Sequence, residues 1–297
     1  MEAIEISIVS PVYKAEALLP ELVERLKNAL EPIGVTYEIV LVDDCSPDNS
    51  WEELKELSKE HPEIRGYKLS RNFGQHNTIS AGIDHAQGKY VIVMDCDLQD
   101  RPEEIPGLYQ QVISDGVEAV LARRADRQDG FIKRAISKIF YLSFWIITGV
   151  KMDGTVANFG IYGPNIMREY RKLREPDRSF PFLINWLGFR RSFRDVDHAR
   201  RQSGSTSYSY TKLFRLAFDI ILAFSDRPIQ IIMQIGVFGL TIHLIMVLCG
   251  LKDGFLMNFQ ALLSSVIILS ISVLGMYLMK VYNATKGRPL YVIESKT

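Results

Sequence analysis

The sequence predicts an α/β fold, in which a mostly parallel β-sheet with helices on both faces precedes interfacial amphipathic helices and a C-terminal two-helix transmembrane hairpin. Two observations lead to this prediction. Apolar, strand-like stretches alternate with helix-like stretches over roughly the first 200 residues, an order typical of parallel sheets. Two long runs near the C-terminus contain no Asp, Glu, Lys or Arg, as expected of helices that cross a membrane.

The elements of the sheet follow from the hydrophobic periodicity. "EISIVSPVY" is an apolar strand that stops at Pro11, and "LLPELVERLKNAL" has helical spacing. "YEIVLVDDCSPDNS" is a second strand that ends at Asp43 and Asp44, and the helix "WEELKELSKEH" follows it. "IRGYKLSRN" and "KYVIVMDCDLQD" are the third and fourth strands, with the helix "QHNTISAGIDHAQG" between them.

Polar side chains gather where these strands end. Ligands of open parallel sheets bind beyond the carboxyl ends of the strands, so we expect these side chains to converge on one crevice. They are Pro11, Tyr13, Asp43, Asp44, Arg71 and Asp95 to Asp97.

The stretch "VIVMDCDLQD" runs from four apolar residues directly into Asp95, Asp97 and Asp100. Crowded carboxylates repel one another unless a cation screens them, and Asp or amide oxygens suit Mg²⁺ or Mn²⁺. Strand alternation would place Asp95 and Asp97 on one side and Cys96, as a small core residue, on the other. The alternative is a solvated acidic loop that caps the helix beginning near Pro102.

Composition limits the partners and the compartment. Lys plus Arg and Asp plus Glu are 35 each among 297 residues, so charge predicts no nucleic-acid partner. The three cysteines have no CxxC spacing and fit neither a zinc site nor a disulfide framework. They favour a reducing, cytoplasmic compartment. The first residues carry acid rather than a basic stretch, so no secretory signal peptide is predicted.

The uncharged runs, residues 229–250 and 259–279, predict a membrane hairpin with spans at 229–250 and 259–282, because about 20 apolar residues cross the hydrocarbon core. The alternative is a pair of buried core helices. Arg227 precedes the first run, whereas Lys280, Lys286 and Arg288 come at the end of the second or after it. The positive-inside rule then predicts a multi-pass inner-membrane protein, with the N-terminal domain and both termini in the cytoplasm.

Two further segments, 131–150 and 210–227, are apolar on one side and basic on the other. "FIKRAISKIFYLSFWIITGV" and "TKLFRLAFDIILAF" therefore predict helices that lie in the membrane interface. The alternative is that these amphipathic helices pack on the soluble domain.

Several motifs resemble the family 2 glycosyltransferases in order and spacing, over nearly the whole chain. They are "SPVYKAEALLPEL", "EIVLVDDCSPDNS", "LSRNFGQHNTISAGIDHAQGKYVIVMDCDLQDRPEEIP" and "RRQSGSTSYS". With two C-terminal spans, the chain is most similar to polyprenyl-phosphate sugar transferases, such as dolichol-phosphate mannose synthase and bacterial undecaprenyl-phosphate glucosyltransferases. The resemblance implies a GT-A catalytic domain at 1–209, with a Rossmann-like sheet that binds a nucleotide sugar, and a cytoplasmic tail at 283–297.

The resemblance also implies a donor site. Pro11 and Tyr13 would line the nucleoside pocket, with Glu16 beside the ribose or base. Asp43 would accept hydrogen bonds from the base, and Asp44 would support the turn or cap a helix. Arg71 and Gln75 would position the donor's phosphates or sugar, although Gln75 could also simply begin a helix. Asp95, Asp97 and Gln99 would surround a Mg²⁺ or Mn²⁺ ion, so the catalytic residues would be Asp97, Arg71 and Asp95.

The expected acceptor is a polyprenyl phosphate. A phosphate monoester is already ionised and needs no general base, and the "ED" pair that supplies a base in other family members is missing from 150–200. By resemblance, Arg123, Arg134 and Arg201 would hold phosphates. The chain departs from the family in "RQSGSTSY", where Ser207 replaces a Lys, in "NFGI" at 158–161 and in "GMYLMK" at 275–280.

These expectations define three function classes. The first is an inverting transfer of a sugar from a nucleotide sugar, UDP rather than GDP, to a polyprenyl phosphate. The second is the extension of a glycan on a lipid diphosphate, which the departure at Ser207 favours. The third is a non-catalytic membrane scaffold. The intact Asp95 and Asp97 at the end of the fourth strand argue against this class. A homo-oligomer is compatible with each class.

Overall fold

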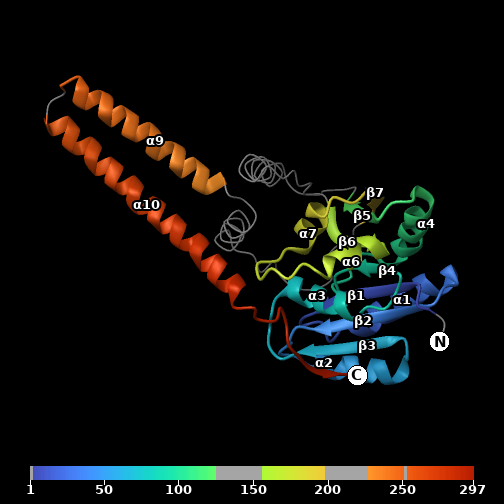
Figure 1. Ribbon diagram of the computed structural model, residues 1–297. Coiled ribbons are helices and arrows are strands. Elements are labelled where there is room, and N and C mark those ends of the chain that lie inside the picture. The colour runs from blue at the N-terminus through green and yellow to red at the C-terminus, as the bar shows by residue number, and fades with distance from the viewer. Residues whose placement is uncertain (1–2, 125–155, 198–226, 251–252) are drawn as a thin grey trace. The chain divides into compact units, whose positions relative to one another are not determined.

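The computed structural model describes residues 3–124, 156–197, 227–250 and 253–297 of the chain (Figure 1). It divides into two compact units. The first joins the N-terminal part of the chain to the last residues, Pro289–Thr297, and the second contains the two long C-terminal helices. The two units are described separately below.

The centre of the first unit is a set of parallel strands: β1 (Ile6–Val12), β2 (Tyr37–Asp43), β3 (Ile64–Leu69) and β4 (Tyr90–Val93). β1 lies between β2 and β4, with Ile8 opposite both Ile39 and Ile92. Every residue of β1 is buried, because helices cover both faces of the sheet. The predicted α/β class with a mostly parallel sheet is confirmed.

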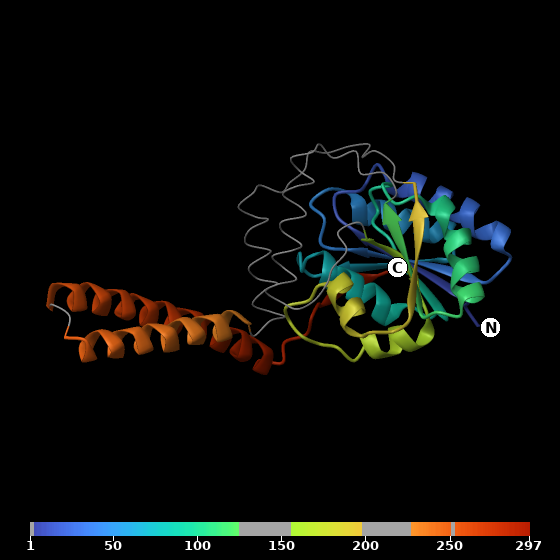
Figure 2. The same ribbon diagram turned by 90° about the horizontal axis from the view of Figure 1, so that it is seen from above.

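Helices form one layer on each face of the sheet (Figure 2). The elements that connect the parallel strands are α1 (Leu19–Leu30), η1 (Glu31–Ile33), α2 (Ser50–Glu60), α3 (Gln75–His85), η2 (Pro102–Glu104) and α4 (Ile105–Asp115). α1 contacts both α2 and α4, whereas α3 lies in the other layer and contacts α7 (Phe180–Trp186). Leu19, Leu22, Leu26 and Leu30 recur at helical spacing and bury the inner face of α1.

The remaining strands complete an eight-stranded sheet in the order β7-β5-β6-β4-β1-β2-β3-β8. β6 (Val156–Tyr162) runs antiparallel to β4 and to β5 (Ala119–Arg124), and β7 (Arg191–Val196) pairs in parallel with β5. α6 (Pro164–Tyr170) follows β6. β8 (Ile293–Lys296) pairs antiparallel with β3 at the opposite edge. The expected cytoplasmic tail thus contains a strand of the catalytic sheet.

Two sequence-predicted boundaries differ from the structure. β1 continues through Pro11 to Val12. The prediction that the fourth strand runs to Asp100 is wrong, because β4 ends at Val93 and a turn follows. Leu98 in that turn has a left-handed backbone with φ of 60°, a conformation that does not continue a strand. Strand alternation therefore does not determine where the carboxylates after β4 point.

The second unit contains α9 (Arg227–Leu248) and α10 (Asp253–Thr285). Their apolar stretches, Ile229–Leu248 and Leu262–Thr285, are long enough to cross a membrane, and only 6 % of each is buried within the chain. Core helices of soluble proteins bury such surface, whereas these helices expose it. The alternative of a buried core pair therefore finds no support. The expected interfacial segments, 131–150 and 210–227, lie outside the described residues apart from Arg227.

Candidate active site

The site lies where the strand order reverses. Strands β2 and β3 follow β1 on one side, and β4 lies on the other, so the gap beyond β1 and β4 is the topological switch point of the sheet. Met94 N–H donates to the Val9 carbonyl, and Asp44 N–H donates to the Val12 carbonyl. Since backbone groups alternate sides along a strand, the ring nitrogen of Pro11, which has no hydrogen, faces the side from which β4 has departed. Pro11 is therefore accommodated in a central strand.

Three strand ends at this edge carry unusual backbone conformations. Lys14, Cys45 and Leu98 are the non-glycine residues with positive φ in the part of the chain that the structure describes, at 55°, 55° and 60°. They follow β1, β2 and β4, respectively. Such conformations are costly for residues with a Cβ and cluster at functional sites. They mark this edge as the functional one.

Hydrogen bonds tie the loop after β1 to the loop after β2. Asp43 is fully buried, and its carboxylate accepts the Ser46 N–H at 3.2 and 3.3 Å and the Ser46 hydroxyl. The Ser46 Oγ in turn accepts the Lys14 N–H at 3.1 Å, and the Ser50 Oγ accepts the Ala15 N–H at 2.9 Å. Burial raises the pKa of Asp43, and the hydrogen bonds from Ser46 oppose that shift. Asp43 thus holds its own turn.

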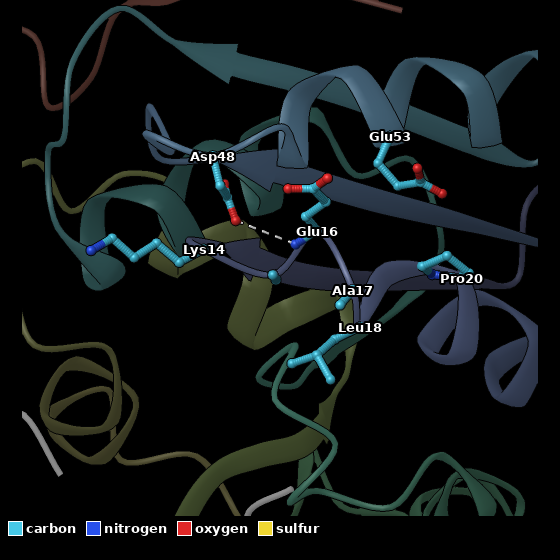
Figure 3. Close-up of a pocket in the computed structure, with 8 residues that line it drawn as sticks. Lys14, Glu16, Ala17, Leu18, Pro20, Asp48 and Glu53 are labelled. Carbon is cyan, nitrogen blue, oxygen red and sulfur yellow. Dashed lines mark hydrogen bonds between the residues drawn. The ribbon is translucent and has the colours of Figure 1, made fainter. Parts of the chain in front are cut away.

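A cavity of about 480 Å³ lies beside these two loops (Figure 3). Its lining includes the carboxylates of Glu16, Asp48 and Glu53, and the Lys14 side chain extends away from them. Glu16 accepts hydrogen bonds from the backbone N–H and side-chain amide of Asn49, both at 3.2 Å. A lining rich in carboxylates favours hydroxyl or N–H donors over phosphates.

Asp44 organises the next loop, residues 70–75, which we call the Arg71 loop. Its carboxylate, 4 % exposed, accepts the Phe73 N–H at 2.7 Å and the Gly74 N–H at 2.9 Å. Burial raises the pKa of Asp44, and these two hydrogen bonds oppose the shift. The Arg71 guanidinium lies over the Phe73 ring, 4.2 Å from its centroid. Asp44 therefore supports the turn that contains Arg71.

The loop after β4 meets α3. Gln75, the first residue of α3, donates from Nε2 to Asp95 Oδ1 at 2.7 Å. The Asp97 Oδ1 accepts the Gln99 N–H at 3.1 Å within the turn. Asp100, 5 % exposed, receives the Asp95 N–H at 3.4 Å. The structure thus brings Gln75 and Asp95 together, two residues that are far apart in the sequence.

The donor set at this turn fits a hard divalent cation. Asp95 and Asp97 supply carboxylate oxygens, and Gln99 adds an amide oxygen, which are the ligand types that Mg²⁺ and Mn²⁺ prefer. No group of three or more His, Cys, Asp and Glu side chains within the described ranges is arranged to hold a metal ion. An ion held by two carboxylates and one amide oxygen would keep coordination positions for water or for phosphate oxygens of a ligand.

Cys96 joins the ends of β4 and β1. Cys96 packs against the hydrophobic core, and its thiol is hydrogen-bonded to the backbone of Tyr13, whose side chain is 47 % exposed. Burial raises the pKa of the Cys96 thiol to about 12, so the thiol stays protonated and unreactive. The interpretation of Cys96 as a small core residue agrees with this environment.

The expected acceptor residues fall mostly outside the described residues. Arg134, Arg201 and Ser207 belong to the undescribed ranges. Arg123 lies in β5 and forms a bidentate ion pair with Asp195 of β7, at 2.6 and 3.1 Å. A phosphate would have to compete with that carboxylate.

Sequence reasoning missed a buried cluster next to α3. His76 Nδ1 accepts the Phe180 N–H at 3.3 Å, and burial, with the nearby Arg178, lowers the pKa of His76 to about 4. Arg178 is 9 % exposed, donates to the Leu173 carbonyl at 2.7 Å and lies over the Tyr170 ring. No local pattern in "REPDRSF", residues 174–180, indicates contact with α3.

A doubly wound sheet with acid and amide side chains at its switch point, continued by antiparallel strands, is the architecture of a GT-A glycosyltransferase. The protein is an enzyme of this class. The chain belongs to glycosyl transferase family 2, whose model matches residues 7–196.

Relatives cover almost the full length of the chain. An uncharacterized glycosyltransferase of Synechocystis is 34 % identical over 98 % of this chain and 95 % of its own. An undecaprenyl-phosphate 4-deoxy-4-formamido-L-arabinose transferase of Shewanella sediminis is 32 % identical over 97 % and 91 %. The Salmonella paratyphi B protein of the same name is 32 % identical over 98 % and 93 %. The chain is thus similar to polyprenyl-phosphate glycosyltransferases.

Solved structures support the fold. The structure of S. aureus TarS 1–349 in complex with UDP-GlcNAc superposes with a TM-score of 0.53 at 18 % identity, over 75 % of this chain and 68 % of that one. At this level of identity the likeness shows the fold alone.

Proposed function

We propose that the protein transfers a sugar from a nucleotide-sugar donor to a polyprenyl phosphate, with inversion at the anomeric carbon. The observation that carries the proposal is the hydrogen bond between Gln75 and Asp95 at the switch point. It joins the Arg71 loop to the acidic turn after β4. The Arg71 guanidinium and the turn that carries Asp95 and Asp97 lie at one edge of the sheet. This arrangement suits a donor whose diphosphate binds both an arginine and a divalent cation.

The donor nucleoside is proposed to lie toward the cavity beside Glu16. Its carboxylate-rich lining suits ribose hydroxyls and base N–H groups, whereas the diphosphate belongs beside Arg71, where the charge is positive. Pro11 lies near the end of β1 and Tyr13 directly follows this strand, at the same edge of the sheet. A UDP-sugar is the proposed donor.

The reaction breaks the bond between the anomeric carbon and the diphosphate. When bound, Mg²⁺ or Mn²⁺ supplies positive charge that stabilises the leaving diphosphate without proton transfer. Asp95, Asp97 and Gln99 would hold the ion, and Arg71 would add a second positive charge at the phosphates. An acceptor phosphate oxygen attacks the opposite face of the anomeric carbon, and because it is already ionised, no general base is required.

The proposed acceptor rests on two observations. Relatives that match nearly the whole chain bear the name undecaprenyl-phosphate transferase. In addition, the described part of 150–200 offers only Glu175 and Asp177 near the positions where other family members carry a base, and these lie in the loop between α6 and α7. A second candidate is the extension of a glycan on a lipid diphosphate, favoured by Ser207 at the position of the usual lysine.

The membrane topology is proposed to be a hairpin with both termini in the cytoplasm. β8 follows α10 in sequence, yet it pairs with β3 in the same sheet as β1. The segments before α9 and after α10 must therefore lie on one side of the membrane, which an even number of spans satisfies. Lys280, Lys286 and Arg288 near the end of α10 support a cytoplasmic location for that side.

The test is a transfer assay with detergent-solubilised protein, a panel of UDP- and GDP-sugars, and polyprenyl phosphate. Mass spectrometry of the lipid product should show one sugar attached directly to a single phosphate. A sugar added only to an existing glycan on a lipid diphosphate would select the second candidate. Product formation from a GDP-sugar alone would replace the proposed donor.

A further inference from the structure

The last residues, Pro289–Thr297, form what we call the C-terminal strap. Its strand β8 covers the outer edge of β3, where Tyr67 lies opposite Lys296. Thr297 N–H donates to the Gly66 carbonyl at 3.0 Å, and the Thr297 Oγ1 accepts the Gly66 N–H at 2.8 Å. Part of the role of the strap is thus to satisfy an open sheet edge.

The strap continues past the end of β3 into the Arg71 loop. β3 ends at Leu69, and the pairing shifts register between Lys68 and Leu69. Beyond that shift, Ser70 N–H donates to the Val292 carbonyl at 2.9 Å. Ser70 directly precedes Arg71, so the strap fixes the backbone at the start of the loop. Cover of the β3 edge alone would not require this bond.

The strap also holds the end of α3. The Tyr291 hydroxyl donates to Asp84 Oδ2 at 2.8 Å, and Arg174 donates to the same oxygen at 2.7 Å. The neighbouring His85 ring lies edge-on to the Tyr291 ring, with centroids 6.3 Å apart. The first residue of this helix is Gln75, which bonds Asp95. Tyr291 therefore fixes the opposite end of the helix that enters the site.

We propose that the C-terminal strap is a positioning element of the donor site, acting through the Arg71 loop. The loop is anchored on its inner side by the Asp44 carboxylate and at its start by the Val292 carbonyl. Arg71 is exposed between these anchors, and its placement depends on both. The inference rests on the proposed function, because it assigns Arg71 to the donor diphosphate.

Two pairs of full-length variants test the proposal. Ser70→Pro removes the N–H that donates to the Val292 carbonyl. Ser70→Ala keeps this N–H and changes only an exposed side chain, so the alanine variant is the matched control. Tyr291→Phe removes only the hydroxyl bonded to Asp84. Tyr282→Phe makes the same change at a tyrosine of α10 that is 57 % exposed. Each protein is measured for donor KM, acceptor KM, thermal unfolding and the Kd of UDP by calorimetry.

We expect Ser70→Pro to raise the donor KM and the UDP Kd about tenfold and Tyr291→Phe about threefold, in line with the loss of one hydrogen bond each. The KM for polyprenyl phosphate and both control variants should remain unchanged. A lower melting temperature with an unaltered donor KM and UDP Kd would show that the strap only covers the edge of β3. That result would overturn the proposal. Tyr291→Phe keeps the test decisive if the proline variant fails to fold.

A double-mutant cycle separates positioning from general loosening. In an Arg71→Ala background, Ser70→Pro should add less than twofold to the UDP Kd, because the residue through which the strap acts is already absent. Additive effects would contradict action through Arg71. The wild-type chain separates failure of this inference from failure of the proposed function. If it binds neither UDP nor GDP, the proposed function is wrong. If it binds a nucleotide and the strap variants bind equally well, only the positioning role of the strap is refuted.

Discussion

Replacing Asp44 with alanine should destabilise the fold and weaken donor binding together. The Asp44 carboxylate is 4 % exposed and accepts two backbone N–H groups, of Phe73 and Gly74, at 2.7 and 2.9 Å. In the alanine variant both N–H groups lose their acceptor inside the protein. The Arg71 loop then loses its inner anchor.

The magnitude follows from those two bonds. A hydrogen bond to a charged group contributes about 1.5–3 kcal/mol, and the burial that raises the pKa of Asp44 cancels part of the sum. We therefore expect Asp44→Ala to lower the free energy of unfolding by about 3 kcal/mol. Asp44→Asn keeps one acceptor oxygen and should cost about half as much.

Thermal unfolding in detergent measures this effect. For a unit of this size each kcal/mol shifts the melting temperature by about 2–4 °C, so Asp44→Ala should lower it by about 6–12 °C. Asp115→Ala, at the exposed end of α4, is the control for loss of an aspartate. If Asp44→Ala loses under about 1 kcal/mol, or if the UDP Kd is unchanged, the assigned role of Asp44 is wrong.

Three further predictions follow from the site, the topology and a buried histidine. Transfer should require Mg²⁺ or Mn²⁺, and Asp97→Ala should abolish turnover without lowering the melting temperature; full activity in excess EDTA would contradict the metal assignment. A reporter fused after Thr297 should be cytoplasmic and one inserted at Asp253 should lie on the opposite face, whereas both on one face would exclude a hairpin of two spans. Burial lowers the pKa of His76 from 6.5 to about 4, so the unfolded chain binds a proton first as the pH falls. The neutral His76 side chain therefore contributes about 3 kcal/mol to the free energy of unfolding above pH 6.5. This contribution is lost as the pH falls toward 4. His76→Gln should flatten that pH dependence of thermal unfolding; an unchanged slope in this variant would refute the assignment.

The parallel core was predictable because β1, β2 and β4 are mostly apolar runs followed by polar residues. Topology alone then places Pro11, Asp43 and Asp95 at one edge of the sheet. The end of β4 was not predictable, because the turn after it depends on a left-handed backbone conformation at Leu98. Leucine rarely adopts that conformation. Local composition gives no sign of such a residue.

β8 shows a second limit of local reasoning. Tyr291, Val292 and Ile293 favour strands, so the composition of the tail contained a signal. The partner, β3, lies more than 200 residues earlier in the sequence, and an intervening pair of apolar helices separates them. Contacts of such long range cannot be inferred from periodicity, which reports only the neighbours within one element.

The ion pair between Arg123 and Asp195 bears on the acceptor site. The two residues face each other across the parallel strands β5 and β7, and their side chains are 44 % and 55 % exposed. Exposed ion pairs of this kind contribute little to stability, so Asp195 holds the Arg123 guanidinium only weakly. A phosphate brings more charge and the same two-oxygen geometry to Arg123. The ion pair therefore orients the Arg123 guanidinium at the end of β5. This arrangement is compatible with replacement of the Asp195 carboxylate by a lipid phosphate.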